Sequence, residues 1–192
     1  MNVAWIVAAI ALTAGAAGCT SFRAVEASAG MPGDETIFIL GVSPAHYRVK
    51  VFPGTVRNGI FRESGLRLAA YYGAPRDGYV VGKAKPGDTL AITLVREVAN
   101  EDDVLGKDFV PCAGLKTMVF KVPQSGVFYL GDVTYSPNRH QLEIRYSGDA
   151  GAAQSYLASR HPSLGSTLGT IEYELLPVQM ACSTEIYIPI YL

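Results

Sequence analysis

Alternation of apolar and polar residues is the feature that most restricts how this chain can fold. The period-two segments cover residues 47–51, 142–146 and 171–175. In the first of them, Tyr47, Val49 and Val51 alternate with Arg48 and Lys50. Because successive side chains of a β-strand point to opposite faces, this period predicts strands with one buried and one solvent-facing side.

Turn-forming residues separate these segments at short intervals. Asn58-Gly59 is typical of a two-residue hairpin turn, Pro75 to Gly78 of a second tight turn, and Lys85 to Asp88 of a type II turn. Hairpins in succession favour antiparallel pairing. Further strands are expected at 37–42, 79–83, 89–98, 118–122, 127–134 and 185–192. We therefore expect a mainly β protein, an antiparallel β-sandwich of the immunoglobulin-like or transthyretin-like kind.

A single helix is expected, near residues 150–160. Asp149 is a suitable N-cap, and Pro162 would end the helix. Between them, apolar residues follow one another at three- and four-residue spacing, as on one face of a helix. This short helix should lie across one end or one face of the sheets.

The N-terminus has the pattern of an export signal. An apolar run from Val3 to Leu12 leads into Ala16-Ala17-Gly18-Cys19, which resembles the lipobox of bacterial lipoproteins. The run is shorter than the roughly 20 apolar residues that span a bilayer. We expect residues 1–18 to be a signal peptide and Cys19 to receive lipid. The absence of Lys and Arg before the run, and Ala16 where Leu is usual, leave an ordinary secretory peptide as the alternative.

Cleavage before Cys19 would leave 192 − 18 = 174 residues, enough for one domain with a sizeable core. Residues 19–35 are rich in small side chains and are expected to form a flexible tether, followed by the domain at 36–192. Thr20 follows the cysteine, where Asp would retain some lipoproteins at the inner membrane. We expect a lipid-anchored envelope protein, on the periplasmic side of the outer membrane if the host is Gram-negative.

The two remaining cysteines, Cys112 and Cys182, form an even set in an exported chain, which favours one disulfide bond. Two buried free thiols are the alternative. A metal site is not expected, because His46, His140 and His161 lack ligand spacing. No cofactor is expected either.

The chain resembles uncharacterised bacterial lipoproteins that carry a transthyretin-like or carboxypeptidase-regulatory-like β-sandwich. The resemblance covers roughly residues 36 to 177. It rests on three segments: Gly78 to Val80 leading into Lys85 to Leu90, Gly126 to Val133, and Asp149 to Leu164. It implies a sandwich fold and an envelope location, and it brings no defined activity.

Catalytic motifs are not recognised, so no catalytic residue is assigned. Gly165 to Gly169 has its serine in second place, unlike the nucleophile elbow of hydrolases. Glu101 to Asp103 lacks the ligand spacing of a calcium loop and is expected at a solvated hairpin tip. The near balance of 16 basic and 17 acidic residues, without charged blocks, disfavours nucleic-acid binding. We expect the isolated domain to have no hydrolytic turnover.

Tyr71 and Tyr72 are the candidate recognition residues. In a strand, one of the two rings must point away from the core, where it could meet an envelope protein or a glycan. The favoured interpretation of the pair is structural, with one ring in the core and the other covering the rim of the sheet. These observations favour a non-catalytic binding or accessory module. The alternatives are a structural subunit of an envelope or secretion assembly and, less favoured, an envelope hydrolase.

Lipidation of Cys19 is directly testable. The intact mass of the mature protein should show diacyl or triacyl addition at this cysteine, and Cys19→Ala should move the protein from the membrane fraction to the soluble fraction. Wild-type protein recovered without lipid, after cleavage at another residue, would contradict the prediction.

Overall fold

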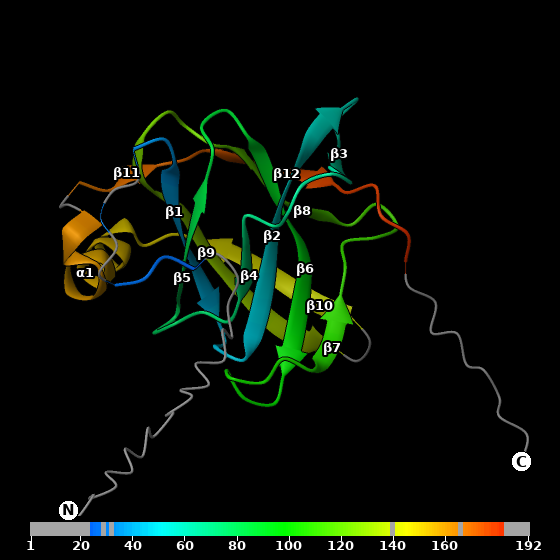
Figure 1. The fold of residues 1–192 in the computed structure, drawn as a ribbon. Coiled ribbons are helices and arrows are strands. Elements are labelled where there is room, and N and C mark those ends of the chain that lie inside the picture. The colour runs from blue at the N-terminus through cyan, green and yellow to red at the C-terminus, as the bar shows by residue number, and fades with distance from the viewer. Residues whose placement is uncertain (1–23, 28–29, 31–32, 139–140, 165–166, 183–192) are drawn as a thin grey trace, which may run out of the picture.

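The computed structural model describes residues 24–27, 30, 33–138, 141–164 and 167–182, and within them two β-sheets pack face to face beside one short helix (Figure 1). The strands are β1 (Thr36–Ser43), β2 (Tyr47–Arg57), β3 (Ile60–Glu63), β4 (Tyr71–Gly73), β5 (Tyr79–Ala84), β6 (Thr89–Val98), β7 (Gly106–Phe109), β8 (Lys116–Lys121), β9 (Gly126–Asn138), β10 (Gln141–Ser147), β11 (Gly169–Thr170) and β12 (Tyr173–Pro177). The helix is α1 (Ala150–Arg160), followed by the 3-10 turn η1 (Pro162–Leu164). The expected mainly β sandwich with one short helix is confirmed.

Three sequence predictions lie outside the described residues. They are the signal peptide at 1–18, the lipidation site Cys19 and the last expected strand at 185–192. Among the helices of the described ranges, none has the length and apolar character needed to cross a membrane.

The two sheets have different strand orders. The five-stranded sheet has the order β10-β9-β1-β5, with β11 also beside β9. The seven-stranded sheet has the order β12-β8-β6-β2-β3, with β4 also beside β2 and β7 beside β6. Most neighbouring strands are antiparallel, as the hairpins predicted. The exceptions are β1 and β11, which both run parallel to β9. Hairpin signals could not reveal these pairs, because they concern only strands that are consecutive in the sequence.

The predicted turns form as expected. Asn58 and Gly59 both have positive φ angles, 52° and 72°, as do Asp77 and Gly78 in the second turn, at 50° and 84°. Two consecutive residues of this kind give the backbone twist that suits a tight hairpin. In the third turn, the Asp88 N–H donates to the Lys85 carbonyl over 3.2 Å. These turns set the register of β2 on β3 and lead into β5 and β6.

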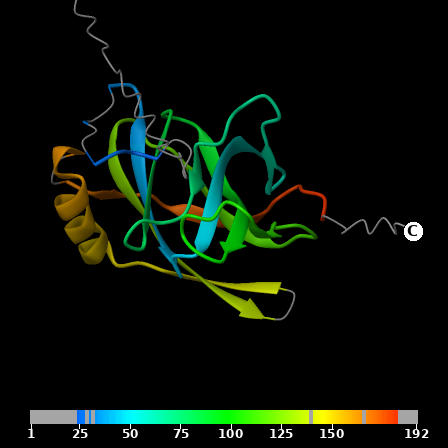
Figure 2. The ribbon, with the colours of Figure 1, turned by 60° about the horizontal axis from the view of Figure 1, so that its bottom comes forward.

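The main core fills the space between the two sheets. It contains inward-facing side chains of both, and its Phe38 and Phe120 rings meet edge to face with centroids 5.8 Å apart. A second cluster lies on the outer face of the five-stranded sheet, where α1 covers it (Figures 1 and 2). Ile37 and Ile39 of β1 are fully buried there together with Ala153 and Leu157 of α1. Burial of a large aliphatic side chain contributes about 1.5–3 kcal/mol, so both clusters contribute to stability.

The helix begins and ends where the sequence predicted. The Asp149 carboxylate accepts a hydrogen bond from the Ala152 N–H over 2.9 Å, which satisfies one of the free N–H groups of the first turn. At the other end, the His161 N–H donates to the Leu157 carbonyl over 2.8 Å. Pro162 then starts η1, so the helix does not continue.

The alternation at 171–175 is only partly maintained. Ile171 and Tyr173 pack with the main core, but Leu175 is 40% exposed. After it, the chain turns toward β3, where the Gln179 N–H donates to the Phe61 carbonyl over 2.8 Å. Val178 joins Phe61 in a third buried cluster on the outer face of the seven-stranded sheet. The alternation of inward and outward side chains is therefore interrupted within β12.

Part of the expected tether at 19–35 belongs to the domain. Ala24 forms an antiparallel bridge with Gly82, and the Val25 N–H donates to the Val81 carbonyl over 3.1 Å. Both side chains are partly buried against the cores. The expectation that the whole stretch is a flexible tether outside the domain is wrong at these residues, because they pair with the edge strand β5.

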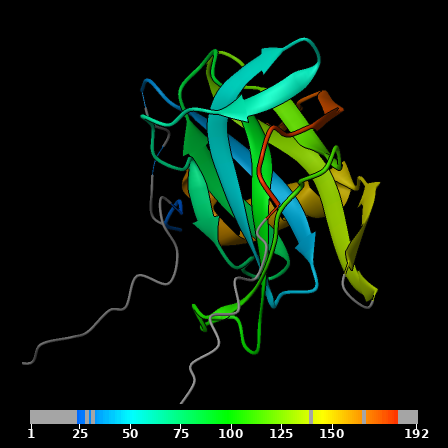
Figure 3. The same cartoon turned by 90° about the vertical axis from the view of Figure 1, so that its right-hand side faces the viewer.

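The predicted disulfide bond joins Cys112 to Cys182 in the structure, with their Cα atoms 5.1 Å apart. It links the connection between β7 and β8 to the segment after β12 (Figure 3). Because this segment also covers Phe61, the bond holds the third cluster closed over the sheet.

Removal of the disulfide should destabilise the fold. Cys112→Ala and Cys182→Ala should each lower the free energy of unfolding by about 2–4 kcal/mol, because the bond restricts an unfolded chain over a separation of 70 residues. Urea denaturation measures the loss, and the double variant should lose no more than either single variant. Free thiols at both positions in peptide maps of exported protein would contradict the prediction.

Candidate functional site

The tyrosine pair of β4 divides between the two faces of its sheet. Tyr71 is 2% exposed in the main core, where its hydroxyl donates to the Ala74 carbonyl over 2.9 Å. Tyr72 lies on the outer face of the seven-stranded sheet. The expectation that one of the two rings points away from the core is therefore met.

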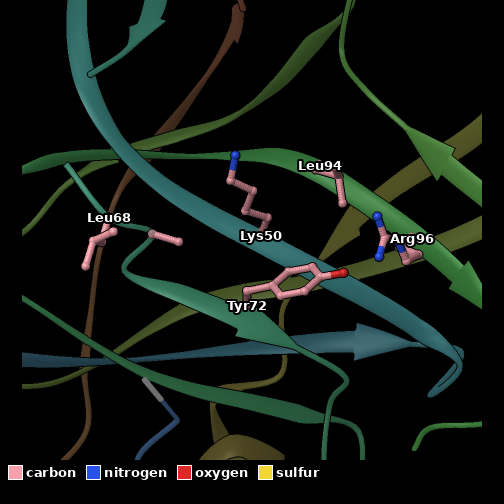
Figure 4. A pocket seen from close by; sticks show the side chains of 6 residues that line it. Lys50, Leu68, Tyr72, Leu94 and Arg96 are labelled. Carbon is pink, nitrogen blue, oxygen red and sulfur yellow. The ribbon is translucent and has the colours of Figure 1, made fainter. Parts of the chain in front are cut away.

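A shallow groove of about 410 Å³ surrounds Tyr72 (Figure 4). Its lining consists of Lys50, Leu68, Ala69, Tyr72, Leu94 and Arg96. Strand register explains the grouping, because Lys50 lies opposite Tyr72 on one side of β2 and opposite Leu94 on the other. Three neighbouring strands thus each contribute an outward side chain at the same level. Leu68, in the connection from β3 to β4, is 72% exposed at the groove.

Two arginines lie against the Tyr72 ring. Arg48 and Arg96 are opposite each other in the β2–β6 pair, and their guanidinium carbons lie 5.3 and 5.9 Å from the ring centroid. A cation over an aromatic face gains about 0.5–1 kcal/mol at an exposed site and more when water is excluded. The three side chains therefore form one packed cluster.

Both arginines also bind the connection between β6 and β7. Arg48 is 1% exposed, and its Nη1 donates to the carbonyls of Glu101 and Asp103 over 3.2 and 3.1 Å. Arg96 forms two parallel hydrogen bonds with the Asp108 carboxylate, over 2.5 and 2.8 Å, and a third with the Val104 carbonyl over 2.7 Å. These contacts fix the guanidinium groups in place.

The hydrogen bonds with Asp108 raise the pKa of Arg96 above its usual value. Paired geometry of this kind is stronger than a single-point ion pair, because both nitrogens of the fork meet both carboxylate oxygens. The Lys50 ammonium is held more loosely, 3.4 Å from a Glu63 oxygen and 4.3 Å from the Phe52 ring centroid. Lys50 is thus the more adaptable cation of the groove.

The Tyr72 hydroxyl is buried and has no hydrogen-bond partner within the described residues. A buried polar group without a partner costs about 1–3 kcal/mol. Because protein atoms cover this oxygen, a partner would meet the Tyr72 side chain through its partly exposed ring.

The predicted hairpin tip is confirmed. Glu101 and Asp102 are exposed between β6 and β7, while the Asp103 carboxylate accepts a hydrogen bond from the Asn100 N–H over 2.9 Å. In the described ranges, no three His, Cys, Asp or Glu side chains gather closely enough to hold a metal ion. Of the Gly165 to Gly169 segment, the first two residues lie outside those ranges.

The described histidines lie apart in the fold. His46 belongs to the turn before β2, with its ring centroid 4.6 Å from that of Tyr47. His161, at the end of α1, is 5% exposed, and burial lowers its pKa below the usual value despite a hydrogen bond with the backbone of Glu26. Burial therefore favours the neutral form of the His161 ring. His140 lies outside the described residues.

Sequence reasoning identified Tyr72 but missed the arginines around it. Alternation placed Arg48 on a solvent-facing side, yet the carbonyl groups of the β6–β7 connection cover it. The proximity of Arg96 depends on the register of β2 on β6, which no local pattern specifies. Among known proteins, no family model and no curated sequence matches this chain.

Burial of His161 predicts acid sensitivity. An unfolded histidine takes up a proton near pH 6.5, whereas the folded protein resists protonation at this lower-pKa site. The free energy of unfolding should therefore fall as the pH drops below about 6.5, by at most about 1.4 kcal/mol per pH unit from this residue, until the folded protein is also protonated.

Urea denaturation of wild type and His161→Gln between pH 7.5 and 5 measures this contribution. The variant should lose less stability than wild type over this pH range. An equal decrease in wild type and His161→Gln would exclude the assignment.

Proposed function

We propose that this protein is a lipid-anchored, non-catalytic accessory module of a bacterial cell envelope, and that it binds a partner protein through the groove around Tyr72. The anchor is inferred from the sequence alone, from the apolar run and the Ala16 to Cys19 segment. The groove is the structural observation that supports binding.

The groove is organised before any partner arrives. Its side chains come mainly from three paired strands, and hydrogen bonds hold both guanidinium groups against Tyr72. The groove side chains therefore lose little conformational entropy when a partner binds, which lowers the free-energy cost of association. Tyr and Arg are also the residue types most enriched among the energetically dominant positions of protein interfaces.

A protein partner suits this chemistry better than a glycan. Sugars stack on an open aromatic face, whereas guanidinium groups already lie against the Tyr72 ring. A polypeptide brings carbonyl or carboxylate acceptors for Lys50, and apolar side chains for Leu68 and Leu94. The proposed ligand is therefore a polypeptide segment with both an apolar side chain and a hydrogen-bond acceptor.

Site-specific cross-linking in cells tests the location. A photoreactive amino acid in place of Leu68 should give a discrete protein adduct. The matched control is Leu66, which belongs to the same connection and is fully exposed but does not line the groove. The same adduct from both positions, or none from position 68, would count against this surface.

Affinity measurements with the recovered partner test the chemistry. Tyr72→Ala should weaken binding about 30-fold, the equivalent of roughly 2 kcal/mol at a dominant interface residue, and Leu68→Glu should also weaken it. Tyr72→Phe keeps the ring and should lose less than Tyr72→Ala, while Leu66→Glu should bind like wild type. Unchanged affinity of Tyr72→Ala, with its fold intact by circular dichroism, would refute the proposed groove.

A further inference from the structure

The segment Ala24–Ala27, here called the N-terminal clasp, is held on the domain from two sides. On one side it meets β5, through the bridge of Ala24 with Gly82 and the 3.1 Å hydrogen bond from Val25 to Val81. This contact fixes the N-terminal chain at one edge of the five-stranded sheet.

The other side of the clasp meets the end of α1. Val25 packs against the cluster beneath the helix, and the Ser163 hydroxyl donates to the Ala27 carbonyl over 3.4 Å. His161 hydrogen-bonds with the backbone of Glu26. The clasp is therefore fixed between β5 and the segment that follows the helix, in a position set by several independent contacts.

The clasp leaves a short link to the proposed lipid. From Cys19 to Ala24 there are five residue steps, which span at most about 18 Å when fully extended. A compact domain of this size has a radius of gyration of about 15 Å and hence an outer radius near 19 Å. Because the link is no longer than the radius, the domain cannot turn every face to the membrane.

We infer that the clasp holds the α1 side of the domain against the lipid bilayer that carries the anchor. This inference rests on the proposed lipidation of Cys19. The bilayer is then the partner of the face formed by the clasp and the exposed side of α1, and the orientation of the domain on the membrane is fixed.

The exposed side of α1 is formed mostly by small side chains. It consists of Ala150, Gly151, Ala152, Ser155, Ala158, Ser159 and Arg160. The helix itself contains no acidic residue, but exposed carboxylates lie beside it, at the N-cap Asp149, at Glu26 of the clasp and at Asp77, which is 2.8 Å from Arg160. Charge therefore adds no attraction to anionic headgroups, and the orientation rests on the short link and the clasp. Small side chains also let the helix approach the surface closely.

The membrane-facing side and the Tyr72 groove belong to different sheets. The helix covers the outer face of the five-stranded sheet, and the groove opens on the outer face of the seven-stranded sheet (Figures 1 and 4). Contact with the bilayer thus leaves the groove open to a partner.

Energy transfer from the domain to labelled lipid tests the orientation. The lipidated full chain is reconstituted in phosphatidylcholine–phosphatidylglycerol vesicles that contain a headgroup-labelled acceptor. A donor dye is placed on Ser159→Cys in α1 or, as the control, on Leu66→Cys in the fully exposed connection after β3. We expect transfer from position 159 to be at least about twice that from position 66.

Two further variants test the short link and the clasp one at a time. Insertion of twelve Gly and Ser residues after Thr20 lengthens the link, and Val25→Pro removes the N–H that donates to Val81. Both should reduce the difference between the two dye positions. Equal transfer from positions 159 and 66 in the otherwise wild-type protein would overturn the inference.

Failure of the orientation is distinguishable from failure of the anchor. Protein that floats with the vesicles but shows equal transfer overturns only the orientation, whereas protein that does not float and carries no lipid overturns the anchor and the orientation together. Hydrogen exchange on Cys19→Ala tests the clasp without lipid. The Val25 amide should be protected, and rapid exchange there would also overturn the inference.

Discussion

The position of β1 is the constraint on which the rest of the structure depends. This strand lies between β5 and β9 and is buried on both faces. Phe38 and Leu40 point into the space between the sheets, while Ile37 and Ile39 point toward α1. One strand therefore supports two cores, and with Gly126 to Thr134 it forms the parallel pair that joins distant parts of the sequence.

The groove depends on the same core through β2. Tyr47, Val49 and Val51 face inward and are fully buried, which fixes the strand that carries Arg48 and Lys50 on its other side. A recognition surface built on a packed strand keeps its geometry better than one built on a mobile loop. The β6–β7 connection adds carbonyl groups, and Asp108 of β7 adds a carboxylate, which together hold the guanidinium groups against Tyr72.

Local chemistry made the hairpins and the helix predictable. Asn58-Gly59 and Asp77-Gly78 adopt turns that few other residue pairs tolerate, and Asp149 caps α1 by its own side chain. Contacts between distant segments were not predictable in this way. The burial of Arg48 requires carbonyl groups more than fifty residues away, and β1 pairs with β9 although the strands β2 to β8 separate them in the sequence. Small residues near the N-terminus predicted a free tether. Their pairing with the edge strand β5 could not be predicted, because amino-acid composition contains no information about which strand edge a segment contacts.

The clasp has one more consequence, which concerns association between copies. A strand at the edge of a sheet offers unpaired N–H and C=O groups on which another chain can add a strand. The Val25 N–H donates to the Val81 carbonyl on the outer edge of β5, so the protein's own chain already pairs with part of this edge. Proteins that share a membrane surface meet at high local concentration. For the proposed lipid-anchored protein, the clasp would therefore protect this edge against edge-to-edge aggregation.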